Sequence, residues 1–399
     1  MRKKFLLACV AGTAMAISLT GCGTEDTTTT SATTDTTNST EASQTQVTGK
    51  VSSISDGTVT LALGEVDENA GPGQGGSSDD NQTPHEMPDN GNGVFNYGSG
   101  TPVNISDSTI TTTADNSGGI QTTGGGTTNA SNLTVDTSGN SSAAIRSDRG
   151  GGTVNVDGGS YTSNGYNSPA VYSTAAITVK NATLTANNSE ALVIEGQNSI
   201  DLEDCTVSGN MSDTKGTSSD ENVHNVMIYQ SMSGDADVGT SSFSMTGGSL
   251  TSNNGDMFYI TNTDCTLSLS GVDIVNKDSD AYLMNITGNS ASHGWGTAGA
   301  NGAQVTFTAD DQTLEGDIRV DSISTLNMTL SGNSTFTGTI NIDENEDGGE
   351  AVSANAVVTI EKGSTWTLTG DCTITSLTNN GTINFNGHTI TLADGTVLK

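Results

Sequence analysis

The chain has 399 residues, of which 12 are Lys or Arg and 45 are Asp or Glu, so its formal net charge at pH 7 is −33. This acidic excess argues against nucleic-acid binding, because neutralising phosphates requires clustered Lys and Arg. Only 32% of the residues are hydrophobic and 14% are charged, which is too little apolar material for the core of an ordinary compact globule. A fold must therefore come from a pattern that needs few apolar residues.

Residues 1–21 have the layout of a bacterial export signal. Residues 2–4 are basic, residues 5–19 are largely apolar, and Leu19-Thr20-Gly21-Cys22 follows. These last four residues resemble a bacterial lipoprotein lipobox, and the resemblance implies that Cys22 is lipidated and anchors the mature chain to the extracellular face of the cell membrane. An uncleaved anchor and an ordinary secretory signal are the alternatives. Loss of the three basic residues would leave 9 basic and 45 acidic residues, a net charge of −36.

Three segments separate the signal from the body of the protein. Residues 22–46 are rich in Ser and Thr and predict a flexible spacer. Residues 47–64 alternate apolar and polar side chains on both sides of Asp56-Gly57, which predicts a β-hairpin. Residues 65–100 are rich in Gly, Pro and Asp and predict a disordered loop. The body is then residues 101–399.

The body repeats one spaced pattern: an apolar residue, a second one two positions later, Gly, Asn or Asp two positions further, and another apolar residue three positions after that. From Val103 the first positions advance by 25, 26, 23, 23, 43 and 24 residues, the long step being one repeat plus an insertion. Such periods indicate a solenoid, in which each repeat buries its apolar face against its neighbours. The copies are Val103-Ile105-Asp107-Ile110, Thr128-Ala130-Asn132-Val135, Val154-Val156-Gly158-Tyr161, Ile177-Val179-Asn181-Leu184, Ile200-Leu202-Asp204-Val207, Phe243-Met245-Gly247-Leu250, Leu267-Leu269-Gly271-Ile274 and Ile383-Phe385-Gly387-Ile390.

Each repeat predicts three short strands. The two apolar residues of the first strand share one face because side chains alternate along a strand. The Gly, Asn or Asp tolerates a positive φ and turns the chain into the second strand. A third apolar run, such as 192–194, supplies the third strand. Because parallel crossovers are right-handed, the prediction is an all-β fold: a right-handed single-stranded parallel β-helix of about ten or eleven coils, with an N-terminal β-hairpin.

An asparagine recurs three residues after the second-strand apolar position. It stands at Asn164, Asn187, Asn210 and Asn253. Stacked repeats would bring these amides into one column, bonded to each other and to the turn backbone. The alternative is a chance excess in a chain rich in Ser, Thr, Asn and Gly.

The best candidate metal site is an acidic loop near the C-terminus. Asp343, Asn345 and Asp347 precede Gly348 with the spacing of a calcium loop, and the segment resembles the front of an EF-hand loop. Ala354 stands where that loop would carry its bidentate Glu, and Glu350 is the candidate replacement. The alternative is an acidic turn without a metal.

Two sets of residues are candidate ligand contacts. Arg146, Asp148 and Arg149 follow the third strand of one repeat. The arginines could contact a carboxylate or sulfate sugar, or they could form a salt bridge with Asp148 or with an acidic residue of a neighbouring repeat. Tyr172, Tyr229 and Tyr259 end three of the third strands. If they face outward they form a stacking platform for sugars, and if they face inward they belong to the core. No sequence motif identifies a catalytic residue.

The coil pattern and the asparagine column resemble the pectin-lyase-like right-handed parallel β-helix superfamily. The stretches SAAIRSDRGGGTVNVDGG, QSMSGDADVG and VDSISTLNMTLSG resemble uncharacterised adhesin-like β-helix surface lipoproteins of Gram-positive gut bacteria. That resemblance implies an adhesin-like or polysaccharide-binding role with no established activity. The superfamily's pectate lyases use clustered Asp for calcium and Arg as base. Only Arg146 or Arg149 with Asp148 could begin such a site, so no catalytic residue is carried over.

The sequence therefore predicts a lipid-anchored extracellular β-helix protein, adhesin-like, that binds a polysaccharide or a host-surface glycan, with Ca²⁺ as the candidate cofactor. One alternative is a polysaccharide lyase or glycoside hydrolase of the same fold. The other is a passive structural spacer on the cell surface.

Overall fold

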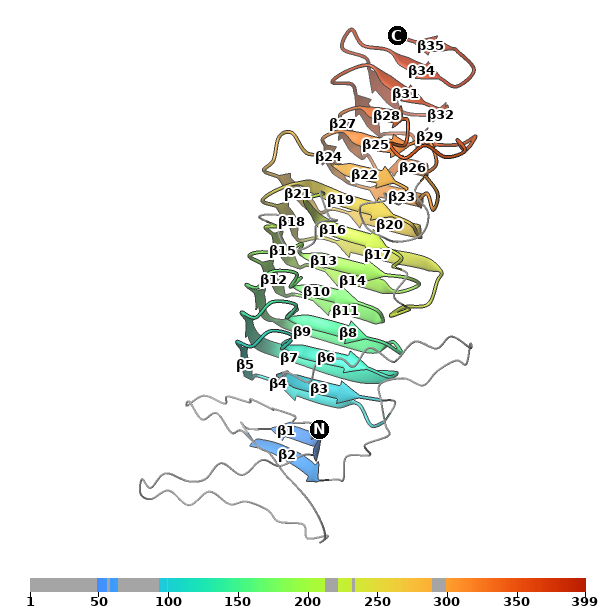
Figure 1. Cartoon of the computed structure of the whole chain (residues 1–399). Coiled ribbons are helices and arrows are strands. Elements are labelled where there is room, and N and C mark those ends of the chain that lie inside the picture. Colours follow the sequence, from blue (N-terminus) through green and yellow to red (C-terminus); the bar gives the residue numbers. More distant parts are fainter. Residues whose placement is uncertain are drawn as a thin grey trace.

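The computed structural model describes residues 49–55, 58–63, 93–98, 100–211, 222–231, 234–288 and 299–399. The predicted signal, Cys22 and the spacer 22–46 lie outside these residues, as does most of the predicted loop 65–100. Every regular element in the described part is a β-strand (Figure 1). No segment of it forms a helix of the length and hydropathy needed to cross a membrane.

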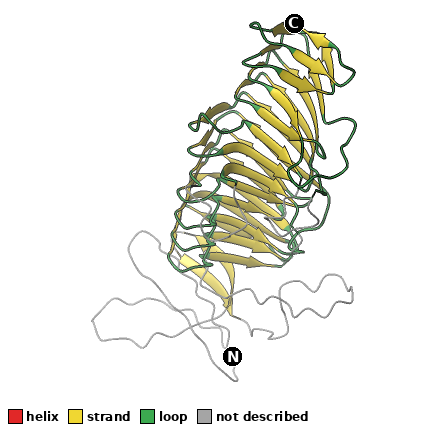
Figure 2. Cartoon of the chain, turned by 45° about the horizontal axis from the view of Figure 1, so that its top comes forward, coloured by secondary structure: helices red, strands yellow, loops and turns green. Residues whose placement is uncertain are grey.

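Most described strands belong to two large parallel sheets that run along the molecule, with loops at their edges (Figure 2). We call the first one the long sheet. Its strands are β4 (Val103–Ser106), β5 (Thr109–Thr112), β7 (Gly126–Thr137), β9 (Gly152–Ser163), β11 (Ala176–Lys180), β12 (Thr183–Ala186), β14 (Ser199–Glu203), β15 (Thr206–Gly209), β17 (Thr240–Thr246), β18 (Ser249–Ser252), β20 (Asp264–Ser270), β21 (Asp273–Asn276), β23 (Gln304–Asp310), β26 (Thr325–Ser331), β29 (Ala356–Ile360) and β32 (Ser376–Asn379).

The second large sheet carries the predicted tyrosines, and we call it the tyrosine sheet. Its strands are β3 (Val94–Tyr97), β6 (Ile120–Thr123), β8 (Ile145–Asp148), β10 (Val171–Ser173), β13 (Leu192–Glu195), β16 (His224–Tyr229), β19 (Asp256–Thr261), β22 (Met284–Thr287), β25 (Ile318–Asp321) and β28 (Ile340–Asp343).

Three smaller sheets complete the described strands. The short sheet contains β24 (Thr313–Glu315), β27 (Thr335–Thr337), β30 (Thr365–Thr367) and β33 (Thr382–Asn384). A C-terminal sheet contains β31 (Cys372–Ile374), β34 (Ile390–Leu392) and β35 (Val397–Leu398), and an antiparallel pair contains β1 (Gly49–Ser55) and β2 (Thr58–Leu63).

Equivalent strands of successive repeats pair in parallel, with equivalent positions opposite each other. Ile177 lies opposite both Val154 and Ile200. Ile200 lies opposite Phe243, although 43 residues separate them. The long step is therefore one repeat with extra residues looped out, as the sequence predicts. Parallel sheets of this extent are consistent with an all-β solenoid.

The turn position of the pattern has a positive φ in all eight predicted copies, and in the first seven it lies between the first-strand and second-strand positions, which confirms its assignment there. The φ angles are 49° at Asp107, 52° at Asn132, 72° at Gly158, 53° at Asn181, 52° at Asp204, 64° at Gly247, 61° at Gly271 and 85° at Gly387. Most side chains avoid this left-handed region because Cβ approaches the following carbonyl oxygen. The same turn continues beyond the predicted copies at Asp311, where φ is 50°.

The predicted asparagine column is present. The Asn187 Nδ2 amide donates to Asn164 Oδ1 at 2.7 Å, and Asn210 Nδ2 donates to the Asn187 carbonyl at 3.1 Å. Asn253 bonds instead to the Gly209 carbonyl, at 2.8 Å. The column thus ties turn to turn along one corner of the stack.

One continuous apolar core lies between the sheets. It is built from the inward residues of every strand position. Phe243 from the long sheet meets Phe258 from the tyrosine sheet with ring centroids 6.0 Å apart. Trp366 is fully buried, stacks on Phe336 at 5.8 Å and donates from Nε1 to the Gly338 carbonyl at 3.0 Å.

The predicted copy that begins at Ile383 is wrong in its strand assignment. Ile383 pairs with Trp366 in the short sheet, which holds the second-strand position, and Ile390 pairs with Cys372. The first strand of this repeat is β32 instead, which pairs with β29. Paired positions of the last repeats are only 17 to 19 residues apart. In these shorter repeats the pattern's apolar spacing spans the second and third strands instead of the first and second.

The predicted loop 65–100 also needs a correction. Strand β3 lies within it and pairs in parallel with β6. Val94 is buried, and buried Asn96 donates from Nδ2 to the Thr127 carbonyl at 2.7 Å. A strand of four residues among Gly and Asn is too short to show a period in the sequence.

The turn position can be tested at Asp311, an exposed residue with a φ of 50°. Asp311→Val should lower the free energy of unfolding by about 1–2 kcal/mol, because a β-branched side chain is disfavoured in the left-handed region. Asp311→Gly should leave stability nearly unchanged. Chemical denaturation of both variants checks this, and equal stabilities would contradict the assigned turn.

Candidate functional site

Five of the six sequence-predicted contact residues, all except Arg149, lie on the outer face of the tyrosine sheet. Arg146, Tyr172 and Val193 occupy one row across neighbouring strands, and Met227 and Tyr259 continue it. Their strand neighbours, such as Val171 and Leu192, point into the main core. The row therefore points the other way, and we call these outward side chains, with Asp148, Glu195 and Tyr229, the tyrosine cluster.

The tyrosine cluster contains a second apolar cluster, separate from the main core, and is not an open platform. Val193, Met227, Tyr229 and Tyr259 pack together, and Tyr172 packs against them. Tyr229 is 8% exposed and Tyr259 is 4% exposed, while Tyr172 is partly exposed. Neither predicted alternative describes this arrangement, because the rings face away from the main core and are nevertheless mostly covered.

Arg146 lies at the partly exposed edge of the tyrosine cluster. Its guanidinium forms an ion pair with Asp148 at 2.9 Å and lies 5.2 Å from the centroid of the Tyr172 ring. Burial alone would lower the pKa of Arg146, but Asp148, Tyr172 and Asp235 together outweigh it, so the pKa lies above its ordinary value. The Arg146 guanidinium therefore lies over the Tyr172 ring, is held by Asp148, and is partly exposed to solvent.

Glu195 is the polar centre of the tyrosine cluster. This carboxylate is 1% exposed and accepts hydrogen bonds from the hydroxyls of Tyr172 and Ser231. The Tyr229 hydroxyl donates to the same carboxylate at 3.0 Å. Bonds to a carboxylate are stronger than neutral ones, so these contacts fix the two phenol rings in place.

Burial raises the pKa of both Tyr172 and Tyr229 well above the ordinary value. The Glu195 charge acts in the same direction on both, while Arg146 partly offsets it at Tyr172. Both phenols therefore stay protonated and remain donors to Glu195 well into the alkaline range.

His224 closes the other side of the cluster. Its ring stacks on Tyr259 with centroids 5.1 Å apart, and its Nδ1 lies 3.0 Å from the Asn222 carbonyl. Asp256, on the neighbouring strand, accepts from Asn285 Nδ2 at 2.9 Å. Sequence patterns did not identify His224 or Glu195, because nothing in their spacing shows which residues of later repeats lie beside them.

Arg149 points to a different partner from Arg146. Its guanidinium pairs with Asp235, 86 residues later in the chain. The predicted alternative of an ion pair is therefore observed for both arginines, and Arg146 is the one that also contacts an aromatic ring.

The acidic loop does not gather its predicted calcium ligands. Asp343 accepts from Arg319 Nε at 3.1 Å, and Asn345 Nδ2 donates to buried Asp321 at 2.5 Å. Asn345 Oδ1 accepts the backbone N–H of Asp347 at 3.0 Å. No group of three His, Cys, Asp or Glu residues suited to a metal occurs in the part of the chain that the structure describes. The arrangement fits an acidic turn held by Arg319 better than a calcium loop.

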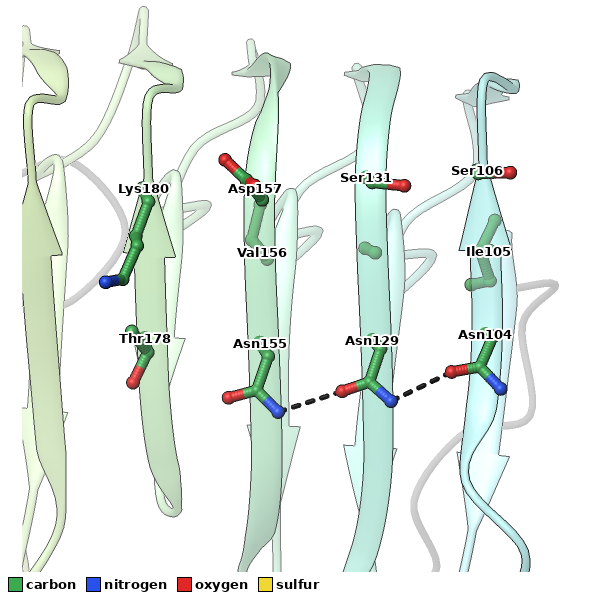
Figure 3. A pocket seen from close by; sticks show the side chains of 11 residues that line it. Asn104, Ile105, Ser106, Asn129, Ser131, Asn155, Val156, Asp157, Thr178 and Lys180 are labelled. Carbon is green, nitrogen blue, oxygen red and sulfur yellow. Dashed lines mark hydrogen bonds between the residues drawn. The ribbon is translucent and has the colours of Figure 1, made fainter.

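A shallow groove with a volume of about 400 Å³ lies on the outer face of the long sheet. Figure 3 shows two rows of side chains along it, Asn104, Asn129 and Asn155 in one and Ser106, Ser131 and Asp157 in the other. Asn129 Nδ2 donates to Asn104 Oδ1 at 2.9 Å, and Asn155 Nδ2 donates to Asn129 Oδ1 at 2.8 Å. These asparagines advance by 25 and 26 residues, the same steps as the repeat, so the spacing alone could have identified the row.

No family model matches the chain, and no curated protein or solved structure is detectably similar to it.

The protonation of the tyrosine cluster gives a pH prediction. An unfolded tyrosine ionises near pH 10, whereas Tyr172 and Tyr229 keep their protons to higher pH in the folded state. The unfolded state then binds fewer protons above pH 10, so stability should be full below that pH and fall as the pH rises. Thermal melts between pH 8 and pH 11 test this. In Tyr172→Phe the fall should be shallower, and an unchanged slope in the variant would contradict the assignment.

Proposed function

We propose that this protein is a lipid-anchored extracellular β-helix protein, adhesin-like, that binds a polysaccharide or a host-surface glycan. The anchor is Cys22, and the body is a right-handed β-helix of about ten or eleven coils, related to the pectin-lyase-like superfamily and to adhesin-like surface lipoproteins. The stacked parallel sheets and their in-register repeats support this description of the body. The Leu19-Thr20-Gly21-Cys22 segment supports the anchor.

The observation that carries the proposal is Arg146 on the face of Tyr172. Carbohydrate sites combine an aromatic face, which covers the apolar side of a sugar ring, with nearby donors for its hydroxyls or carboxylates. Tyr172 is partly exposed and held by Glu195, and Arg146 supplies N–H donors beside it. The same pair favours a ligand with at least one acidic group, since Arg binds carboxylate and sulfate well.

Calcium is a secondary part of the proposal. Its candidate ligands remain Asp343, Asn345, Asp347 and Glu350, which would have to rearrange around Arg319 to bind an ion. Glycan binding should therefore be measured both with calcium and with a chelator. We expect the same affinity in both, and calcium-dependent binding that Asp347→Ala abolishes would restore calcium to the mechanism.

The test is binding of residues 23–399 to an array of glycans and to mucin, with Arg146→Gln as the variant. Loss of two charge-assisted contacts should weaken binding at least about ten-fold. Arg319→Gln is the matched control, because Arg319 is also a paired arginine on the tyrosine sheet and, among the described residues, its guanidinium lies over no aromatic ring. Circular dichroism and melting of both variants verify that they fold.

The outcomes separate the alternatives. Binding that Arg146→Gln weakens and Arg319→Gln does not supports the proposal. Products that absorb in the ultraviolet or carry new reducing ends would favour a polysaccharide lyase or glycoside hydrolase instead. No ligand under any condition would contradict the proposal and leave the passive spacer.

A further inference from the structure

The groove on the outer face of the long sheet is lined by the row Asn104, Asn129 and Asn155, and we call it the asparagine groove. The amides of this row can form more hydrogen bonds than they form with each other. Its lining comes from β4, β7, β9 and β11, which lie side by side in Figure 3. It shares no residue with the tyrosine cluster, since the two lie on different sheets. A ligand site here would go beyond the proposed function by adding a second site, and it rests on the proposed role in glycan binding.

We propose that this groove binds an uncharged, hydroxyl-rich polysaccharide chain that lies across the strands along the asparagine row. The groove is open and continuous over neighbouring strands, so it suits an extended polymer rather than a compact small molecule. Neighbouring strands are about 4.8 Å apart, so the row presents similar groups at short, regular intervals.

The asparagine row has donors and acceptors to spare. An Asn side chain has two N–H donors and an oxygen with two lone pairs. The row uses one N–H of Asn129 and one of Asn155, and one lone pair each of Asn104 and Asn129. Each amide thus keeps at least one donor and one acceptor site. Sugar hydroxyls both donate and accept, so they match such a row.

The hydrogen bonds within the asparagine row also hold the amides in place before a ligand binds. Each asparagine is held by its neighbour in the row, so less side-chain freedom remains to be lost on binding. Asn104 and Asn155 are exposed and Asn129 is partly exposed. The row is therefore both ordered and accessible.

The charges in the groove point to a neutral ligand. Asp157 Oδ1 accepts from Asn181 Nδ2 at 2.8 Å, and Lys180 pairs with Glu203 at 2.5 Å. The hydrogen bond and charge of Glu203 raise the pKa of Lys180. Both charged residues of the lining already have partners, and the lining contains no aromatic ring. A polyanion would gain no counter-charge here and would be repelled by a chain of net charge −33.

Two variants and a matched control test the groove. Asn129→Ala removes the central amide of the row, which bonds to both Asn104 and Asn155. Ser131→Tyr places a large side chain in the groove and keeps all three amides. Asn187→Ala is the control, because it removes an equivalent amide bond at the turn column, outside the groove. The probes are a soluble neutral glucan, mannan and galactan, with polygalacturonate as the acidic comparison, measured by calorimetry on residues 23–399.

We expect the unmodified protein and Asn187→Ala to bind one of the neutral polymers equally. Asn129→Ala should weaken that binding by about ten-fold or more, because about two hydrogen bonds to the ligand are lost. Ser131→Tyr should weaken it by about as much, because the tyrosine ring blocks the polymer from the amides. Neutral-polymer binding that is unchanged in both groove variants would overturn the inference, and so would binding of polygalacturonate alone. If Asn129→Ala unfolds, Ser131→Tyr decides the question by itself.

Failure of the inference is distinguishable from failure of the proposed function. Glycan binding that Arg146→Gln abolishes and neither groove variant alters would overturn the groove and keep the function. An unmodified protein that binds none of the array glycans, mucin or the four soluble polymers would overturn both.

Discussion

Every feature of this molecule depends on backbone hydrogen bonding between a strand and its equivalent one repeat later. A single repeat has too few apolar residues to hold a core, so its inner face is stable only when the next repeat covers it. Parallel pairing in register places Val154, Ile177 and Ile200 in one file. This explains how a chain with 32% hydrophobic residues builds a continuous core.

The same register creates files of outward residues, and these provide the candidate functional surfaces. On the tyrosine sheet the file brings Arg146 beside Tyr172, 26 residues later. On the long sheet it brings three asparagines into one hydrogen-bonded row. The two faces differ in chemistry. The first combines a cation, phenols and a buried carboxylate, whereas the second offers only amides, hydroxyls and paired charges.

Features that repeat with the period were predictable from the sequence. The positive φ angles and the Asn164–Asn187 contact follow from spacing alone. Features that depend on unlike residues in neighbouring repeats were not. The acidic loop has the spacing of a calcium loop, yet Asp343 already accepts a hydrogen bond from Arg319, which lies 24 residues earlier. For Tyr229 and Tyr259, the alternation of side chains along a strand predicts which face of the sheet they occupy. It does not predict which other residues pack over that face.

The central claim is that equivalent positions of successive repeats are direct neighbours, and engineered disulfides test it most directly. Asn129 and Asn155 lie opposite each other on adjacent parallel strands, within the Cα separation that a disulfide requires. Asn104 and Asn155 are two strands apart. Cys205, Cys265 and Cys372 are buried, and burial raises the pKa of each thiol, so they should stay unreactive in residues 23–399.

Mild oxidation, followed by a thiol count and peptide mapping of the cross-link, gives the result. The account predicts a disulfide in the Asn129→Cys, Asn155→Cys variant and none in the Asn104→Cys, Asn155→Cys variant. Cross-linking of the second pair without the first would contradict the stacked register, and with it both proposed binding faces.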